Sequence, residues 1–91
     1  MEITVKDYLQ CLDKHALVRL EWQQYAMDDH TYDLWLQSPF ANCIFMNVEY
    51  TLKNMINHFE WIGDMAITGI KEEDHFFIKS GEYKKIYKIQ F

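Results

Sequence analysis

The strongest pattern in the sequence is a stripe of apolar residues that recurs every three or four positions between residues 48 and 62. This spacing places the stripe on one face of an α-helix. Asn47 is a favourable N-cap for this helix, and Gly63 is a typical residue just beyond its end. We therefore predict a helix over about 48–62 that packs one face on the rest of the domain. The stripe consists of Val48, Thr51, Leu52, Met55, Ile56, Phe59 and Ile62.

A second helix is predicted near the N-terminus, over about residues 5–14. Thr4 and Asp7 have the spacing of a capping box, in which side chains of the first turn satisfy its free backbone groups. Ile3 and Tyr8 occupy the two positions of a hydrophobic staple across the same turn. The apolar residues that follow the helical period here are Val5, Tyr8, Leu9, Leu12 and Ala16.

Between these helices, alternation of apolar and polar residues predicts a hairpin. In residues 17–27, Val18, Leu20 and Trp22 alternate with polar side chains, which favours a half-buried strand. A helix is the alternative for the same stretch, because its apolar residues also fit a helical spacing. The polar segment Asp28–His30 is typical of the turn that would follow the strand.

The returning strand of this hairpin is predicted where Tyr32, Leu34 and Leu36 occupy every second position. Ser38 and Pro39 should end it. Residues 42–46 form a short apolar run that fits a third strand. The start of the next helix is the alternative, since Ser-Pro is also a good helix opening.

Three more strands are predicted after the second long helix. Residues 66–70 and 75–79 flank the acidic segment 72–74, which indicates a hairpin, and residues 80–82 turn the chain into a last strand. The order α-β-β-(β)-α-β-β-β predicts an α+β fold, with an antiparallel or mixed sheet of about five to six strands packed against two helices. At 91 residues the chain has room for one core, so we expect a single domain over 1–91. One face of the last strand carries Tyr87, Ile89 and Phe91.

The sequence gives no sign of a membrane or secretory segment. No apolar run approaches the roughly 18 residues of a membrane span, and the first residues lack the basic and apolar regions of a signal peptide. Cys11 and Cys43 lie in apolar patterns, so both are predicted to be buried thiols, with neither a disulfide nor a zinc site. A reducing cytoplasm is therefore the expected location.

No catalytic or cofactor motif is recognisable. The four histidines lack the spacing of metal ligands, neither serine lies in a nucleophile elbow, and the three glycines are isolated. Asp28, Asp29, His30 and Asp33 could hold a divalent cation, but a solvated turn explains the same residues. We therefore expect no enzyme activity, no metal and no cofactor.

The net charge of −5 lies entirely in residues 1–50, because residues 51–91 contain six acidic and six basic residues. An acidic first half disfavours direct binding of nucleic acid. It favours a partner with a basic surface, unless the charge only confers solubility. The lysines of Tyr83–Lys88 alternate with aromatic residues, which can bind single-stranded nucleic acid, but lysine also protects the edge of a sheet. We adopt the edge interpretation.

The sequence contains three Trp, six Tyr and six Phe, more than a core of this size needs. Trp35 would point away from Leu34 and Leu36 in a strand, and Trp61 lies off the main helical stripe. Tryptophan and tyrosine are enriched in protein interfaces, so a surface patch is one explanation. A second core layer or a homodimer interface is the other. The predicted partner-binding residues are Trp22, Tyr25, Asp28, Asp29, Asp33, Trp35 and Trp61.

These features favour a non-enzymatic protein-binding domain, an inhibitor or accessory protein that masks a basic surface of a larger partner, such as a nucleic-acid channel. Small size, mild acidity and aromatic content are similar to those of inhibitor, immunity and anti-defence proteins of phages and mobile elements. That likeness is compositional and covers no motif. The alternative is a small-molecule or nucleotide-binding module, dimeric or not, with a pocket lined by tryptophan and tyrosine.

Overall fold

The computed structural model describes residues 2–23, 29–42 and 45–91. These residues form an α+β domain with one mixed four-stranded sheet and five helices, in place of the five to six strands and two helices predicted. No helix in them is long and apolar enough to span a bilayer. The helices are α1 (Val5–Gln10), α2 (Asp29–Gln37), α3 (Pro39–Asn42), α4 (Val48–His58) and α5 (Glu60–Gly63). The strands are β1 (Leu17–Glu21), β2 (Met46–Asn47), β3 (Gly69–Phe77) and β4 (Glu82–Gln90).

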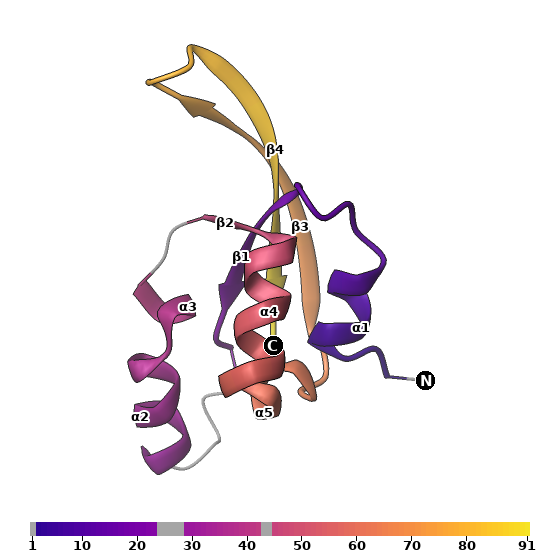
Figure 1. Cartoon of the computed structure of the whole chain (residues 1–91), viewed down its shortest axis with the longest axis vertical. Coiled ribbons are helices and arrows are strands. Elements are labelled where there is room, and N and C mark those ends of the chain that lie inside the picture. The colour runs from indigo at the N-terminus through magenta and orange to yellow at the C-terminus, as the bar shows by residue number, and fades with distance from the viewer. Residues whose placement is uncertain (1, 24–28, 43–44) are drawn as a thin grey trace.

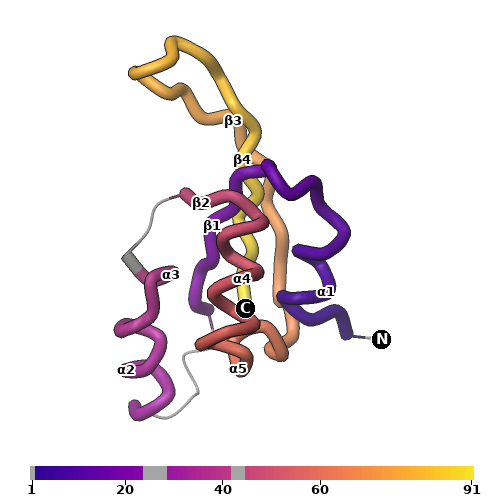
Figure 2. Tube along the Cα trace, in the orientation of Figure 1, coloured from indigo at the N-terminus to yellow at the C-terminus, as the bar shows by residue number. Residues whose placement is uncertain are grey.

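The sheet has the strand order β2-β1-β4-β3. β4 is antiparallel to β3 and parallel to β1, with Leu17 opposite Ile86 and Glu21 opposite Gln90. Figure 2 shows these two central strands side by side, although they come from opposite ends of the chain. The short strand β2 pairs with β1 at the other edge of the sheet.

One face of the sheet packs against the helices. Alternate residues of β1 point to this face, which gives the strand its alternating burial. All the helices contribute side chains to the core that forms there, and Figure 1 shows α4 crossing in front of the strands. The most deeply buried core residues include Val5, Leu9, Val18, Phe40, Val48, Met55, Ile62, Ile89 and Phe91.

The predicted helix starts are confirmed by their caps. The Thr4 hydroxyl accepts a hydrogen bond from the Asp7 N–H at 3.2 Å. The Asn47 side-chain oxygen accepts one from the Tyr50 N–H at 2.7 Å. These bonds satisfy backbone donors that the first helical turn leaves free. α1 is shorter than predicted, and Cys11 just after it is exposed rather than buried. Cys43 lies outside the described residues.

The prediction of a single helix over 48–62 is wrong at its C-terminal end, where the structure has two helices. Phe59 has a non-helical backbone, with φ −132° and ψ 43°, and separates α4 from α5. Gly63 is the last residue of α5 rather than a residue beyond one continuous helix. Its missing side chain makes room for the core, since a Cβ there would lie 2.9 Å from the Sδ of Met55. Ile56, predicted to be core, is exposed on the outer side of α4.

The strand predicted over Tyr32–Leu36 is wrong, because residues 29–37 form α2. Trp35 and Ser38 point inward, while Leu34 and Leu36 lie on the exposed flanks of the helix. The alternation of Tyr32, Leu34 and Leu36 is thus compatible with a strand and with a helix. Burial of Trp35 favours the helix. Asp29 in the first turn adds a favourable interaction with the helix dipole.

Pro39 opens the short helix α3, but this helix is separate from α4, so the alternative that residues 42–46 begin the next long helix is not confirmed. The strand predicted over 42–46 is reduced to β2 at Met46 and Asn47, and residues 43–44 lie outside the described chain. The strand preferred for 17–27 is confirmed as β1, but it ends at Glu21. Residues 24–28 are not described.

The turn predicted at residues 72–74 is also wrong, because β3 runs through it without a break. Lysines of the neighbouring strand β4 neutralise the acidic residues: Lys85 lies 3.7 Å from Glu72, and Lys88 lies 2.9 Å from Glu73. The chain reverses only at residues 78–81. Gly81 adopts φ +68°, a conformation that favours glycine, and its N–H donates to the Phe77 carbonyl at 2.8 Å.

Candidate interaction surface

The far end of the β3–β4 hairpin extends beyond the rest of the sheet. β1 begins at Leu17, opposite Ile86, so residues 82–85 pair with β3 alone among the described strands. Figure 1 shows this end rising above the helices. We call residues 74–85 the arm and the rest of the chain the body. A two-stranded ribbon of this kind gains little stability by itself.

One face of the arm carries an exposed aromatic pair. Phe76 and Tyr83 lie opposite each other in the ladder, with ring centroids 5.1 Å apart. Both rings are nevertheless exposed, as is Ile78 at the turn, with exposed fractions of 46% for Phe76, 73% for Tyr83 and 88% for Ile78. Three large apolar residues therefore face solvent within a short segment.

The other face of the arm carries a second aromatic cluster, to which the body contributes Phe45. The Phe45 ring centroid lies 4.7 Å from that of His75 and 5.8 Å from that of Phe77. The Lys84 ammonium lies 5.5 Å from the Phe77 ring centroid, within the range of a cation–π contact. A hollow of about 340 Å³ opens beside this cluster. It is lined by Phe45, His75, Phe76, Phe77, Ile78 and Lys79.

The charge of the arm differs in sign from that of the body. The arm contains three lysines and two acidic residues, which gives it a formal charge of +1. Because the whole chain has a net charge of −5, the body has a charge of −6. The acidic residues of the body include Asp29 and Asp33, both exposed on α2. The molecule thus presents an apolar, weakly basic projection on an acidic domain.

The tryptophans predicted to bind a partner lie together, but in the core. Trp22 stacks on Trp35 with ring centroids 5.8 Å apart, and Phe91 meets both rings edge-on. Trp61 is half-buried, with its ring centroid 6.3 Å from that of Trp22. This arrangement matches the second core layer that the sequence left open. Binding through Asp29 and Asp33 stays a prediction, and Tyr25 and Asp28 lie outside the described residues.

Phe76, Ile78 and Tyr83 are not among the residues predicted from the sequence to bind a partner. Phe76 and Ile78 belong to an apolar run beside a Ser-Gly turn, which is equally typical of a buried strand end. Tyr83 belongs to the alternation of lysines and aromatic residues that was interpreted as a sheet edge. The structure exposes Phe76, Ile78 and Tyr83 because the pairing of β1 with β4 begins only at Leu17 and Ile86, and all three residues lie beyond that point.

A second hollow, of about 330 Å³, lies at the end of β1 beside the aromatic layer. Arg19, Glu21 and Gln23 supply polar groups to its wall, and Trp22, Tyr32 and Trp35 supply aromatic ones. This mixture fits a small polar ligand with a flat ring. No cluster of three or more metal-ligating side chains occurs in the described residues.

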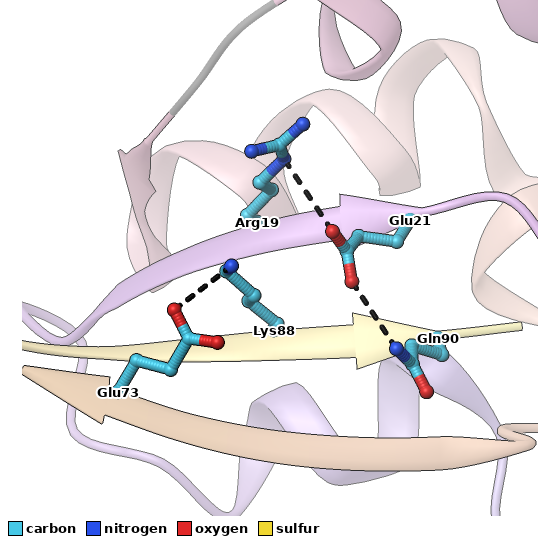
Figure 3. A network of polar contacts seen from close by, with 5 residues as sticks. All are labelled: Arg19, Glu21, Glu73, Lys88 and Gln90. Carbon is cyan, nitrogen blue, oxygen red and sulfur yellow. Dashed lines mark hydrogen bonds and ion pairs between the residues drawn. The ribbon is translucent and has the colours of Figure 1, made fainter.

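The sheet face turned away from the helices carries a polar network (Figure 3). Glu21 accepts a hydrogen bond from the Gln90 amide at 3.3 Å and lies 3.8 Å from the Arg19 guanidinium. On the same face Lys88 pairs with Glu73. The hydrogen bond from Lys88 holds the pKa of the Glu73 carboxyl below its ordinary value. On the other face, burial raises the pKa of Tyr8, and Glu72 adds to the effect.

The low pKa of Glu73 predicts a pH-dependent contribution to stability. A carboxyl whose pKa falls on folding stabilises the protein above its unfolded pKa of about 4.3 and loses this effect as the pH falls through the folded pKa. Glu73→Gln should therefore lower the urea midpoint at pH 7 and leave it unchanged at a pH below the folded pKa. Glu82→Gln, in the same hairpin, controls for the lost charge. An equal decrease in the urea midpoint of Glu73→Gln at both pH values would contradict the low pKa of Glu73.

In comparisons with protein families, curated proteins and solved structures, no match to this chain was found. Function is therefore inferred from the geometry and charge of the chain itself.

Proposed function

We propose that this chain is a non-enzymatic protein-binding domain that docks on a larger protein and masks a site there, as an inhibitor or accessory protein does. The observation that carries the proposal is the arm, with Phe76, Ile78 and Tyr83 exposed together on a projecting ribbon. Adjacent large apolar side chains in solvent mark interaction surfaces, because burying them in a complex is favourable.

The charge of the body supports a particular kind of partner. A body of −6 is attracted to a basic surface, and this attraction speeds encounter at low ionic strength. The arm, with its opposite sign, would then face a different part of the same partner. Two zones of opposite charge fix the orientation of docking as well as its rate.

Site-specific crosslinking tests the proposal. A photoreactive amino acid replaces Tyr83 on the arm in one variant and Tyr50, an exposed residue of α4, in a matched control. In a lysate of the cells that naturally produce the chain, irradiation should link one larger protein to position 83 and none to position 50. An excess of the unmodified chain should compete with the crosslink, and Phe76→Ser should reduce it, because a small polar residue removes the apolar contact.

Equal crosslinking from both positions, or none from position 83, would contradict docking through the arm. Retention of the product in the Phe76→Ser variant would contradict the apolar contact. Circular dichroism of each variant shows whether the fold is intact.

The second candidate is a small-molecule or nucleotide-binding module. The hollow beside Trp22 and Trp35 favours it, because aromatic walls and nearby polar groups suit a planar ligand. Saturable quenching of tryptophan fluorescence by a nucleotide, with no crosslink from the arm, would favour this function over protein binding.

A further inference from the structure

We propose that an extended acidic segment of the partner adds to the free edge of β3 in the arm, and so forms the third strand of the ribbon. This inference rests on the proposed function and specifies what the arm recognises. The segment would alternate acidic and apolar side chains, since strand residues alternate between the two faces of a sheet.

The arm offers an open backbone edge. β3 is the last strand of the sheet, and β4 is its only strand partner in the described chain. The carbonyl of Phe77 points toward the turn, where it accepts a hydrogen bond from Gly81. In an antiparallel ladder the neighbouring residue, Phe76, then directs its N–H and C=O to the outer side. An added strand can bond to these groups.

The position of addition follows from the side chains along β3. Glu72, Glu73 and Asp74 place three charges in the part of the edge next to the body, and charges of this kind protect an edge strand. Beyond them come Phe76, Phe77 and Ile78, with no acidic residue. Addition is therefore favoured over residues 75–78, beside the 340 Å³ hollow.

The same pattern argues against a second copy of this chain as the occupant. Antiparallel pairing of two β3 strands about Glu73 would bring Glu72, Glu73 and Asp74 against the same acids of the other copy. Like charges directly opposite each other destabilise a sheet, so self-pairing in this register is disfavoured. Pairing about Phe77 would require residues 78 and 79, which lie in the turn after β3, to pair as a strand.

Charge complementarity identifies the occupant as acidic. Lys79 lines the hollow and the Lys84 ammonium lies over the Phe77 ring, so two basic residues lie beside the aromatic residues. An apolar side chain of the segment would enter the hollow, and carboxylates on either side of it would pair with the lysines. A basic segment would instead bring like charges against Lys79 and Lys84.

A defined peptide tests this inference without knowledge of the natural partner. The probe is a short, capped peptide of alternating glutamate and leucine, added to the ¹⁵N-labelled full chain and followed by amide chemical shifts. Saturable shifts should be confined to residues 75–79 and 82–84 of the arm. A lysine–leucine peptide should bind about tenfold more weakly or not at all, because its charges meet Lys79 and Lys84.

Backbone pairing has its own control. N-methylation of alternate peptide amides on the bonding edge removes donors and should weaken binding by about tenfold or more. Methylation of the other set of amides should leave binding unchanged, because those groups face away from β3. This comparison leaves the protein intact, so a folding defect cannot explain the result.

Four results would overturn strand addition by an acidic segment: equal binding of the lysine–leucine peptide, no effect of N-methylation, shifts outside the arm, or concentration-dependent shifts of the arm amides without peptide. The last would identify a second copy as the occupant. If position 83 crosslinks to a partner but the acidic peptide does not bind, this inference fails and the proposed function stands. If position 83 does not crosslink, the function itself fails.

Discussion

Replacing Trp35 by alanine should lower the free energy of unfolding by about 3–5 kcal/mol, a large share of the roughly 5–15 kcal/mol that stabilises a domain. Trp35 is only 5% exposed, and its ring lies 5.8 Å from that of Trp22 and 5.2 Å from that of Phe91. Removing it leaves a cavity at the centre of the aromatic layer. Urea unfolding followed by far-UV circular dichroism measures the change.

Leu34→Ala is the matched control, because Leu34 lies on the same helix and is 38% exposed. Its effect should be smaller, at most about 1 kcal/mol. A variant of Trp35 that unfolds like the parent would contradict its place in the core. If that variant also bound the partner more weakly, the side chain would be the binding anchor that the sequence suggested.

Met55→Ala should cost about 2–5 kcal/mol, while Ile56→Ala on the next residue of α4 should cost about 0.5 kcal/mol or less. Met55 is fully buried and fills the space that Gly63 leaves open. Ile56 is 57% exposed on the other side of the helix. The pair separates burial from helix propensity, because both changes place alanine in the same helix.

Thermal and urea unfolding of the two variants give the comparison. Equal losses would mean that the helix is packed on both sides. A larger loss for Ile56→Ala would place the core on the face predicted from the apolar stripe alone.

Local chemistry explains what the sequence could predict of the fold. Thr4 and Asn47 set the starts of α1 and α4 through hydrogen bonds within one turn, and these need no knowledge of the tertiary structure. The alternation in β1 is also local, since one of its faces meets the core. Such signals predict the α+β class, but they leave open whether the sheet is antiparallel or mixed, because the parallel pairing of β1 with β4 is not local.

The wrong secondary-structure predictions occur where one sequence pattern fits two structures and tertiary contacts decide between them. Residues 32–36 fit a strand and a helix, and contact of Trp35 with Trp22 and Phe91 decides for the helix. The acidic residues 72–74 are typical of a turn until Lys85 and Lys88 lie beside them on β4. Neither contact can be deduced from the local segment.

The candidate site was missed for a related reason. The exposure of a side chain depends on what the whole chain places over it. From residue type alone, Phe76 and Tyr83 are typical of a core, and Trp22 and Trp35 are typical of an interface. In the structure Phe76 and Tyr83 are exposed, and Trp22 and Trp35 are buried. Among the predicted partner-binding residues that the structure describes, Asp29 and Asp33 are exposed, both on α2.

The place of β4 in the middle of the sheet determines the order in which the chain can fold. The hairpin that it forms with β3 is local and can close in about 1–10 μs. Its pairing with β1 must instead close a loop of about sixty residues between Glu21 and Glu82, which is slower. During synthesis the apolar face of β1 therefore remains without its parallel neighbour until residues 86–90 have left the ribosome. The chain should gain its native core late, in a single cooperative step.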